Sequence, residues 1–139
     1  MIILDTNVIS EPMKTVADPA VAAWLDRQAA ETLYLTATNL SEVLFGIEVL
    51  PDGRRKKAMA AGMGELLAGL FGARFLDFDR EAAVAYAILV SRAMSKGFTI
   101  SVADGQIAAI AAVHGFAVAT RDTAPFLAAG VPVINPWVS

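Results

Sequence analysis

The feature of the sequence that most constrains its fold is an alternation of short apolar runs with helical patterns. The chain opens on such a run, residues 1–4, which stops at Asp5. A short continuous apolar run of this kind is typical of a strand buried on both faces inside a parallel sheet. Further strands are expected over residues 32–37, 74–78, 116–120 and 131–134. Because helical patterns separate these runs, the sequence predicts an α/β fold with a mostly parallel five-stranded sheet and right-handed crossovers.

Helix signals fill the intervals between the expected strands. Asp18 followed by Pro19 is typical of a helix start, and Asn39 is expected to open a helix that runs to about Leu50. Residues 54–72 also have a helical pattern, but their three interior glycines each cost about 1 kcal/mol relative to Ala, so one helix or two are expected there. Further helices are expected over residues 79–96 and 101–114, with a short one around residues 125–127.

Composition narrows the chemistry that such a chain performs. With 139 residues, 56% hydrophobic and 18% charged, it is expected to be a single globular domain spanning residues 1–139. It has no Cys and one His, which excludes cysteine-based catalysis and disfavours multi-His zinc sites. The opening residues lack the order of cations before an apolar stretch that marks a signal peptide, and no segment has the composition of a membrane span. A cytoplasmic location is therefore expected.

Four carboxylates fall where an open parallel sheet binds ligands, beyond the carboxyl ends of its strands. Asp5 ends the first strand, and Glu42 lies at the start of the helix after the second. Asp104 lies in the first turn of the helix before the fourth strand, and Asp122 follows that strand. Taken singly, such acids cap helices, complement helix dipoles or stand in turns. Two carboxylates about 4 Å apart repel by roughly 4 kcal/mol at an effective dielectric constant near 20, so a converging group requires a cation or raised pKa values.

The type of ligand indicates the metal. Carboxylate oxygens without His or Cys favour Mg²⁺ or Mn²⁺, which serve phosphoryl chemistry. Thr6, Asn7 and Thr120 stand beside these acids in the sequence. They are expected either to support the site, by holding water or a carboxylate, or to cap helices and turns.

Four segments of the sequence match one known family. They are LDTNVISE at 4–11, TNLSEVLFGI at 38–47, ISVADGQIAA at 100–109 and ATRD at 119–122. In these segments the chain resembles the PIN-domain ribonucleases, specifically the VapC or FitB-like toxins of type II toxin–antitoxin pairs, over essentially its whole length. The resemblance implies a three-layer α/β/α sandwich. It also implies that Asp5, Glu42 and Asp104 are the acidic triad that binds metal and carries catalysis.

The fourth acid departs from the pattern of many relatives. They carry Asn directly after the Thr-Arg pair and an acid one helical turn later, whereas this chain has Asp122 first and Pro125 in the later position. We expect Asp122 to act as a fourth catalytic and metal-binding residue, and whether one or two metal ions bind stays open.

The resemblance further implies an activity and partners. The activity is Mg²⁺- or Mn²⁺-dependent endonucleolytic cleavage of RNA, in which metal-activated water attacks a phosphodiester bond and leaves a 5′-phosphate and a 3′-hydroxyl. The implied partners are the RNA substrate, a small cognate antitoxin protein and a second copy of the chain in a homodimer, with no membrane partner.

Two interpretations without nuclease activity compete with this one. A degenerate PIN domain would act through protein contacts alone, and the departure at Asp122 and Pro125 favours it. A receiver-like regulatory binding domain would share the parallel sheet and the acidic pocket, but it normally carries a late Lys, and no Lys follows Lys96. A haloacid-dehalogenase-like phosphatase would need a second acid where this chain has Asn7.

The basic residues have two interpretations as well. The net charge of −3 gives no nucleic-acid signature, so any polyanion site must be local. Residues 54–57 form the one dense basic run, which either is a solvated helix start or contacts RNA or the antitoxin. Together with the other cations this run is also expected to ring the acidic site; these are Arg74, Arg80, Arg92, Lys96 and Arg121. The apolar surplus over residues 43–50 is either core or a seam for a partner.

Overall fold

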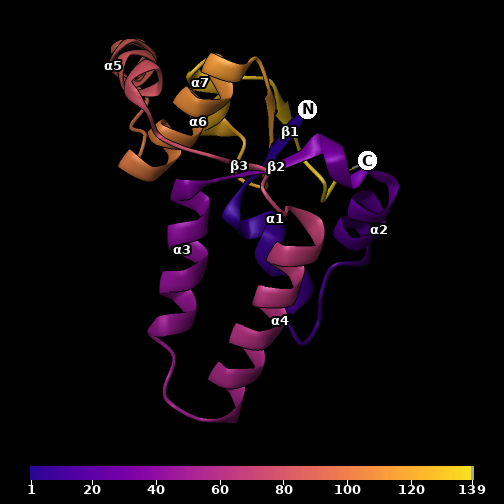
Figure 1. Cartoon of the computed structure of the whole chain (residues 1–139). Coiled ribbons are helices and arrows are strands. Elements are labelled where there is room, and N and C mark those ends of the chain that lie inside the picture. The colour runs from indigo at the N-terminus through magenta and orange to yellow at the C-terminus, as the bar shows by residue number, and fades with distance from the viewer. Residues whose placement is uncertain (139) are drawn as a thin grey trace.

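The computed structural model describes residues 1–138, which form a central sheet covered by helices on both faces (Figure 1). The five strands are β1 (Ile2–Leu4), β2 (Leu33–Thr36), β3 (Phe75–Leu76), β4 (Ala117–Ala119) and β5 (Val133–Ile134). Every strand pair is parallel, and the order across the sheet is β3-β2-β1-β4-β5. The prediction of a mostly parallel sheet is therefore confirmed. The strand that follows Pro132 lies at an edge, where the missing N–H of proline is tolerated.

Seven α-helices connect these strands in the described part of the chain. They are α1 (Thr6–Ser10), α2 (Pro19–Arg27), α3 (Ala37–Glu48), α4 (Arg54–Leu70), α5 (Arg80–Ser95), α6 (Val102–His114) and α7 (Ala124–Ala128). The side chains of Asp18, Asp79 and Ser101 cap α2, α5 and α6, as their positions in the sequence predicted. The left-handed backbone of Gly115, with φ of 69°, ends α6.

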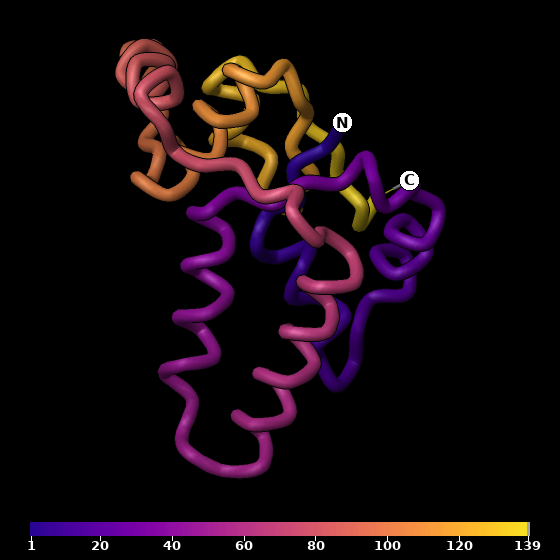
Figure 2. The backbone as a smooth tube through the Cα atoms, in the orientation of Figure 1, coloured from indigo at the N-terminus to yellow at the C-terminus, as the bar shows by residue number. Residues whose placement is uncertain are grey.

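Alternate residues of the strands face opposite sides of the sheet and build two cores. Ile3 and Val118 pack on one side with residues of α5, α6 and α7. Leu4 and Ala119 pack on the other side with residues of α1, α2, α3 and α4. The backbone trace shows the two groups of helices separated by the sheet (Figure 2). The molecule is thus the three-layer α/β/α sandwich that the family resemblance implied.

Helices α3 and α4 form a hairpin that extends from the body of the molecule (Figure 1). The sequence allowed two helices over residues 54–72, but α4 is a single helix despite its glycines. At Gly62 a Cβ atom would lie 2.8 Å from Cε of Met13, the flexible end of a side chain that would have to shift. The other two interior glycines face open space, so each weakens the helix only through its own flexibility.

The start of α3 corrects the sequence prediction by three residues. The cap is Thr36 rather than Asn39: Oγ1 of Thr36 accepts a hydrogen bond of 2.9 Å from the backbone N–H of Asn39. The helix therefore begins at Ala37, and Asn39 is its third residue. Both residue types are good caps, so residue type alone does not separate them.

The basic run 54–57 and Arg74 do not take the places around the acids that the sequence analysis expected for them. Residues 54–57 begin α4 at the far end of the hairpin (Figure 1). There, Nζ of Lys56 donates a hydrogen bond of 3.0 Å to the backbone O of Glu48 and forms an ion pair of 3.5 Å with Oδ1 of Asp52. Arg74 donates to the backbone oxygens of Leu33 and Leu70, so it joins β2 to the end of α4 instead of facing a ligand. Within residues 1–138, no helix is both long enough and apolar enough to span a membrane.

Candidate functional site

The pairing of β1 with β4 brings together residues from the two ends of the chain. Asp5 directly follows β1, and its backbone N–H donates to the O atom of Ala119 at 2.9 Å, which extends the ladder by one residue. Thr120 follows β4 at the same edge of the sheet. The carboxyl ends of parallel strands share one edge, so the acids after β1 and β4 are neighbours, as the sequence predicted.

Asp5 is buried, with 6% of its surface exposed, and three donors hold its carboxylate. Oδ1 accepts from the backbone N–H of Thr6 at 2.8 Å and from Nδ2 of Asn39 at 3.3 Å. Oδ2 accepts from Oγ1 of Thr120 at 2.8 Å. Burial raises the pKa of Asp5 above its ordinary value, the three hydrogen bonds offset this only in part, and the charge of Asp122 raises it further. The hydrogen bonds thus fix the orientation of the Asp5 carboxylate, but they do not fully offset the cost of burying its negative charge.

Glu42 is positioned by α1 as well as by its own helix. Oγ1 of Thr6 donates to Oε1 of Glu42 at 2.8 Å, and Nδ2 of Asn39 lies 3.3 Å from the same hydroxyl. Thr6 therefore touches two of the predicted acids, one through its backbone and the other through its side chain. Of the two roles expected for Thr6, these contacts agree with the one in which it holds a carboxylate.

Asp104 faces the other three carboxylates from the first turn of α6. Burial raises its pKa most, and the negative charges of Asp5, Asp122 and Glu42 raise it further, against a hydrogen bond with Ser101 that lowers it. Oγ1 of Thr38 donates to Oε1 of Gln106 at 3.0 Å, which ties the first turns of α3 and α6 together. Asp104 therefore lies within electrostatic reach of each of the other three predicted acids.

The hydroxyl of Thr120 connects the fourth acid to the first. It accepts from the backbone N–H of Asp122 at 3.1 Å while it donates to Asp5. Asn7 lies on the same side, with its Nδ2 3.4 Å from Oγ1 of Thr120 and its Oδ1 accepting from the backbone N–H of Arg121 at 3.3 Å. Thr120 thus contacts Asp5 and the backbone of Asp122, and Asn7 contacts Thr120 and the backbone of Arg121. Pro125 lies in α7, so the structure offers no carboxylate one helical turn after Asp122.

Sequence reasoning assigned Asn39 only to a helix start and missed its place in the site. The side chain is fully buried, its Oδ1 accepts from Oγ1 of Thr36 at 2.6 Å, and its amide group donates to Asp5 and Thr6. Thr36 and Asn39 stand three residues apart, which is the spacing of a reciprocal cap. That spacing would have indicated Thr36 as the cap and so released Asn39 for another role.

The chemistry of the donor set fits a hard divalent cation. The four acids offer carboxylate oxygens alone, which are the ligands of Mg²⁺ and Mn²⁺. Burial raises the pKa values of Asp5 and Asp104, and the neighbouring carboxylates raise them further. Between residues 1 and 138, no three acidic or histidine side chains converge closely enough to hold an ion jointly in their present orientations. The structure thus brings the acids to one edge of the sheet and leaves their convergence on an ion as a prediction.

Known proteins resemble this chain along nearly its whole length. The model of the PIN domain family matches residues 2–131. The chain is 51% identical to VapC ribonuclease Y4jK of Sinorhizobium fredii, an alignment that covers 99% of this chain and 98% of that protein. It is 44% identical to toxin FitB of Neisseria gonorrhoeae, with 99% of each covered. The crystal structure of FitAcB from the same organism superimposes with a TM-score of 0.95 at 43% identity and covers 100% of both chains.

Proposed function

This chain belongs to the PIN domain family, and from that premise we propose that it is the toxin of a toxin–antitoxin pair and a Mg²⁺- or Mn²⁺-dependent endoribonuclease. The observation that carries the proposal is the group of acids at this edge of the sheet: three donors fix the buried carboxylate of Asp5, and Asp104 lies within electrostatic reach of Asp5, Glu42 and Asp122. The names of the relatives at 51% and 44% identity, a VapC ribonuclease and a FitB toxin, support it. An RNA substrate would place the protein in the cytoplasm, as the sequence predicts.

Each residue of the site has a part in this proposal. Asp5, Glu42, Asp104 and Asp122 would hold the cation. When bound, a divalent ion would supply a Lewis acid that lowers the pKa of water and stabilises charge on a phosphodiester. Thr120 and Asn39 orient the carboxylate of Asp5, and Thr6 orients that of Glu42. Hydrolysis by water needs no side-chain nucleophile, which agrees with a chain that has no Cys and one His.

The proposal is tested by incubating the purified protein with single-stranded RNA in Mg²⁺, in Mn²⁺ and in EDTA. Any bound antitoxin is first removed by unfolding and refolding the protein. The parent is expected to cleave RNA in either metal and not in EDTA, and Asp5→Asn is expected to lose at least about a hundredfold in rate, the scale of loss when one preorganised electrostatic group is removed.

Asp26→Asn is the matched control, because Asp26 lies exposed on α2 and undergoes the same chemical change. It is expected to retain the parent rate. Equal cleavage by the parent in EDTA and in Mg²⁺ would refute the metal mechanism. If the refolded parent cleaves no RNA in any metal, the protein acts by binding alone, as a degenerate or receiver-like domain would.

The toxin assignment has its own test in cells. Induced expression of the parent is expected to arrest growth, whereas Asp5→Asn is expected to be tolerated. Co-expression of the small protein encoded by a neighbouring short reading frame is expected to restore growth and to co-purify with the toxin. A parent that leaves growth unchanged at the same protein level as Asp26→Asn would contradict the assignment.

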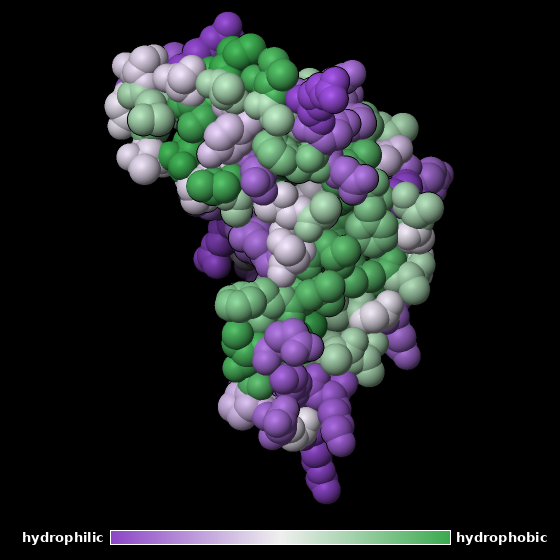
Figure 3. Space-filling view, turned by 60° about the vertical axis from the view of Figure 1, so that its left-hand side comes forward, coloured by the Kyte–Doolittle hydropathy of each residue, from purple (hydrophilic) through white to green (hydrophobic). Residues whose placement is uncertain are grey.

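The proposal also includes a homodimer and a surface for partners. On α3, Val43 and Ile47 are buried in the core, whereas Leu44 and Phe45 are exposed, as is Val49 directly after the helix. Figure 3 shows a hydrophobic area over the middle of the molecule, above a hydrophilic tip. Exposed apolar groups on a surface helix are typical of contacts with protein. Light scattering is expected to give the mass of two chains, and Phe45→Ser is expected to lower it toward one.

A further inference from the structure

A cleft leads from the carboxylates along the hairpin. One cavity of about 240 Å³ is lined by Thr6 and Glu42 of the site and by residues of α3 and α4. A second cavity of about 440 Å³ lies between the turn after α1 and the start of α4. The two share Ser10, Met13 and Met59 in their walls. The two cavities are therefore adjacent, and we term them together the hairpin cleft.

The two ends of the hairpin cleft carry opposite charge. Glu42 lies at one end, and Lys14 and Arg55 lie at the other. Nζ of Lys14 is paired with Oε2 of the buried Glu11 at 2.9 Å. Arg55 has no ion-pair partner in the described part of the chain. The free positive charge of the hairpin cleft is therefore that of Arg55.

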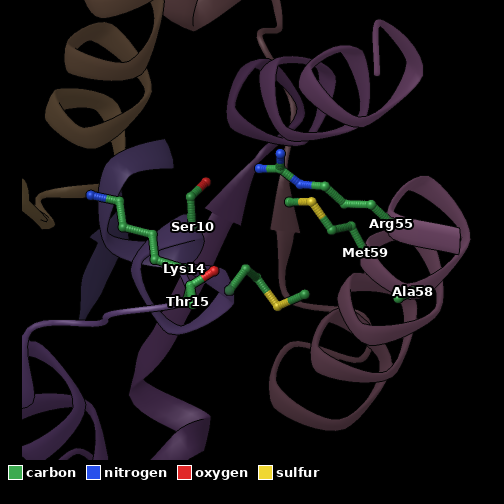
Figure 4. A pocket seen from close by; sticks show the side chains of 7 residues that line it. Ser10, Lys14, Thr15, Arg55, Ala58 and Met59 are labelled. Atoms are coloured by element: carbon green, nitrogen blue, oxygen red, sulfur yellow. The ribbon is translucent and has the colours of Figure 1, made fainter. Parts of the chain in front are cut away.

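The side chains of this end are arranged around Arg55 (Figure 4). The guanidinium group extends from α4 toward Ser10 on the opposite wall, whereas the ammonium group of Lys14 points away from the cavity. Arg55 stands in the first turn of α4, where the helix dipole disfavours a cation by about 0.3 to 1 kcal/mol. An anion in the hairpin cleft would offset this cost, because it would face both the guanidinium group and the positive end of the helix.

We propose that Arg55 binds a backbone phosphate of the RNA strand next to the bond that is cut, an inference that rests on the nuclease function proposed above. If the scissile phosphate of an RNA strand lies at Glu42 and the neighbouring acids, the rest of the RNA can leave the site along the hairpin cleft, which begins at Glu42. The planar guanidinium group matches the geometry of a phosphate, and Ser10 and Thr15 offer hydroxyl donors on the facing wall. The methionine side chains of the floor provide an adaptable apolar surface for a sugar or a base.

Arg55→Gln tests the proposal, with Lys57→Gln as the matched control, since Lys57 belongs to the same basic run and does not line the cavity. Binding of a fluorescein-labelled 12-residue oligouridylate is measured by anisotropy in an Asp5→Asn background, in EDTA, over a series of salt concentrations. Arg55→Gln is expected to weaken binding by about threefold to fivefold, the scale of one exposed ion pair. It is also expected to reduce the slope of log K against log salt by about 0.7, the value for one phosphate contact with a single strand. Lys57→Gln is expected to change neither, and Arg55→Lys to keep the salt slope.

Cleavage by the same variants with Asp5 intact gives a second measurement. Arg55→Gln is expected to raise KM while leaving kcat within a factor of two, because Arg55 lies outside the carboxylate group. Equal effects of Arg55→Gln and Lys57→Gln on binding and on KM would overturn the inference while leaving the nuclease proposal intact. Unchanged RNA binding, together with loss of the complex with the protein from the neighbouring reading frame, would assign the hairpin cleft to that protein. A parent that cleaves no RNA would overturn both proposals.

Discussion

Gly105 is the residue at which the structure makes its sharpest prediction about packing. It lies next to Asp104 in α6, which packs against α5. A Cβ atom at this position would lie 2.6 Å from Cε2 of Tyr86 and 2.9 Å from Cγ2 of Val90. Carbon atoms in contact are normally about 3.5 to 4.0 Å apart. Gly105→Ala therefore forces α5 and α6 to separate or Tyr86 and Val90 to move.

Two opposing terms set the size of the effect. Alanine in place of glycine inside a helix contributes about 1 kcal/mol in favour of folding. Overpacking of a close contact typically costs about 1 to 3 kcal/mol, and here two neighbours are affected, so the upper part of that range applies. Gly105→Ala is therefore expected to lower the free energy of unfolding by about 1 to 2 kcal/mol. For a chain of this size, that corresponds to about 4 °C in Tm for each kcal/mol.

Gly64→Ala provides the matched control. Gly64 is also inside a helix, but a Cβ atom there would have no neighbour within 4 Å. The same substitution is then expected to raise stability by up to about 1 kcal/mol. Thermal unfolding of both variants should move in opposite directions. The nuclease rate should fall for Gly105→Ala, because Asp104 stands one residue away, and stay unchanged for Gly64→Ala.

A double variant checks the cause of the effect. Val90→Ala removes the contact with one of the two side chains that the new methyl group would meet. If the contact is responsible, Gly105→Ala is expected to cost less in the Val90→Ala background than in the parent, with a coupling of about 0.5 kcal/mol or more. A Gly105→Ala variant that is stabilised as much as Gly64→Ala would show that α5 and α6 do not pack as described.

Two further predictions concern the polar groups of the site. Asn39→Ala removes the acceptor of the Thr36 hydroxyl and one donor to Asp5, so it is expected to lower the free energy of unfolding by about 2 to 4 kcal/mol in urea denaturation; a loss below about 1 kcal/mol would contradict the buried network. Asp5→Asn changes the pH dependence of stability. Because burial raises the pKa of Asp5, the folded protein keeps a proton that the unfolded chain releases, so this contribution is full below the ordinary pKa of 3.8 and is lost as pH rises through the raised value. In EDTA, the Tm of Asp5→Asn minus that of the parent is therefore expected to increase as pH rises above about 4. Mg²⁺ is expected to raise the Tm of the parent alone. A difference in Tm that is the same at every pH would contradict the raised pKa of Asp5.

Much of the fold could be predicted because its signals are local. The apolar run before Asp5 indicates a buried strand, and the pair Asp18-Pro19 indicates a helix start. Each signal lies within a few residues of the chain. The places of Asp5, Asp104 and Asp122 after a strand or at a helix start followed from the same signals. The place of Glu42 did not, because α3 begins at Ala37 and Glu42 lies in its second turn instead of its first. A parallel sheet then requires that these positions share one edge.

The features that could not be predicted depend on contacts between distant residues. Asn39 donates to a carboxylate 34 positions earlier in the chain, and no local pattern reports such a pair. The exposed face of α3 was hidden because Leu44, Phe45 and the buried Val43 are all apolar. The direction of Arg55, and so the difference between it and the other basic residues of its run, depends on where α4 lies relative to Ser10.

The central place of β1 in the sheet has a consequence for synthesis on the ribosome. β1 pairs with β2, which is made soon after it, but also with β4, and the hydrogen bond between Thr120 and Asp5 joins residues 115 positions apart. Contacts of such long sequence separation form late, because a long loop must close, at a cost in entropy, before these contacts stabilise the chain. Until β4 and Thr120 have emerged from the ribosome, Asp5 of the nascent chain therefore lacks its hydrogen-bond partner across the sheet. For an enzyme proposed to attack RNA, the order of strands delays assembly of the cutting site until nearly the whole polypeptide has left the machinery that translates it.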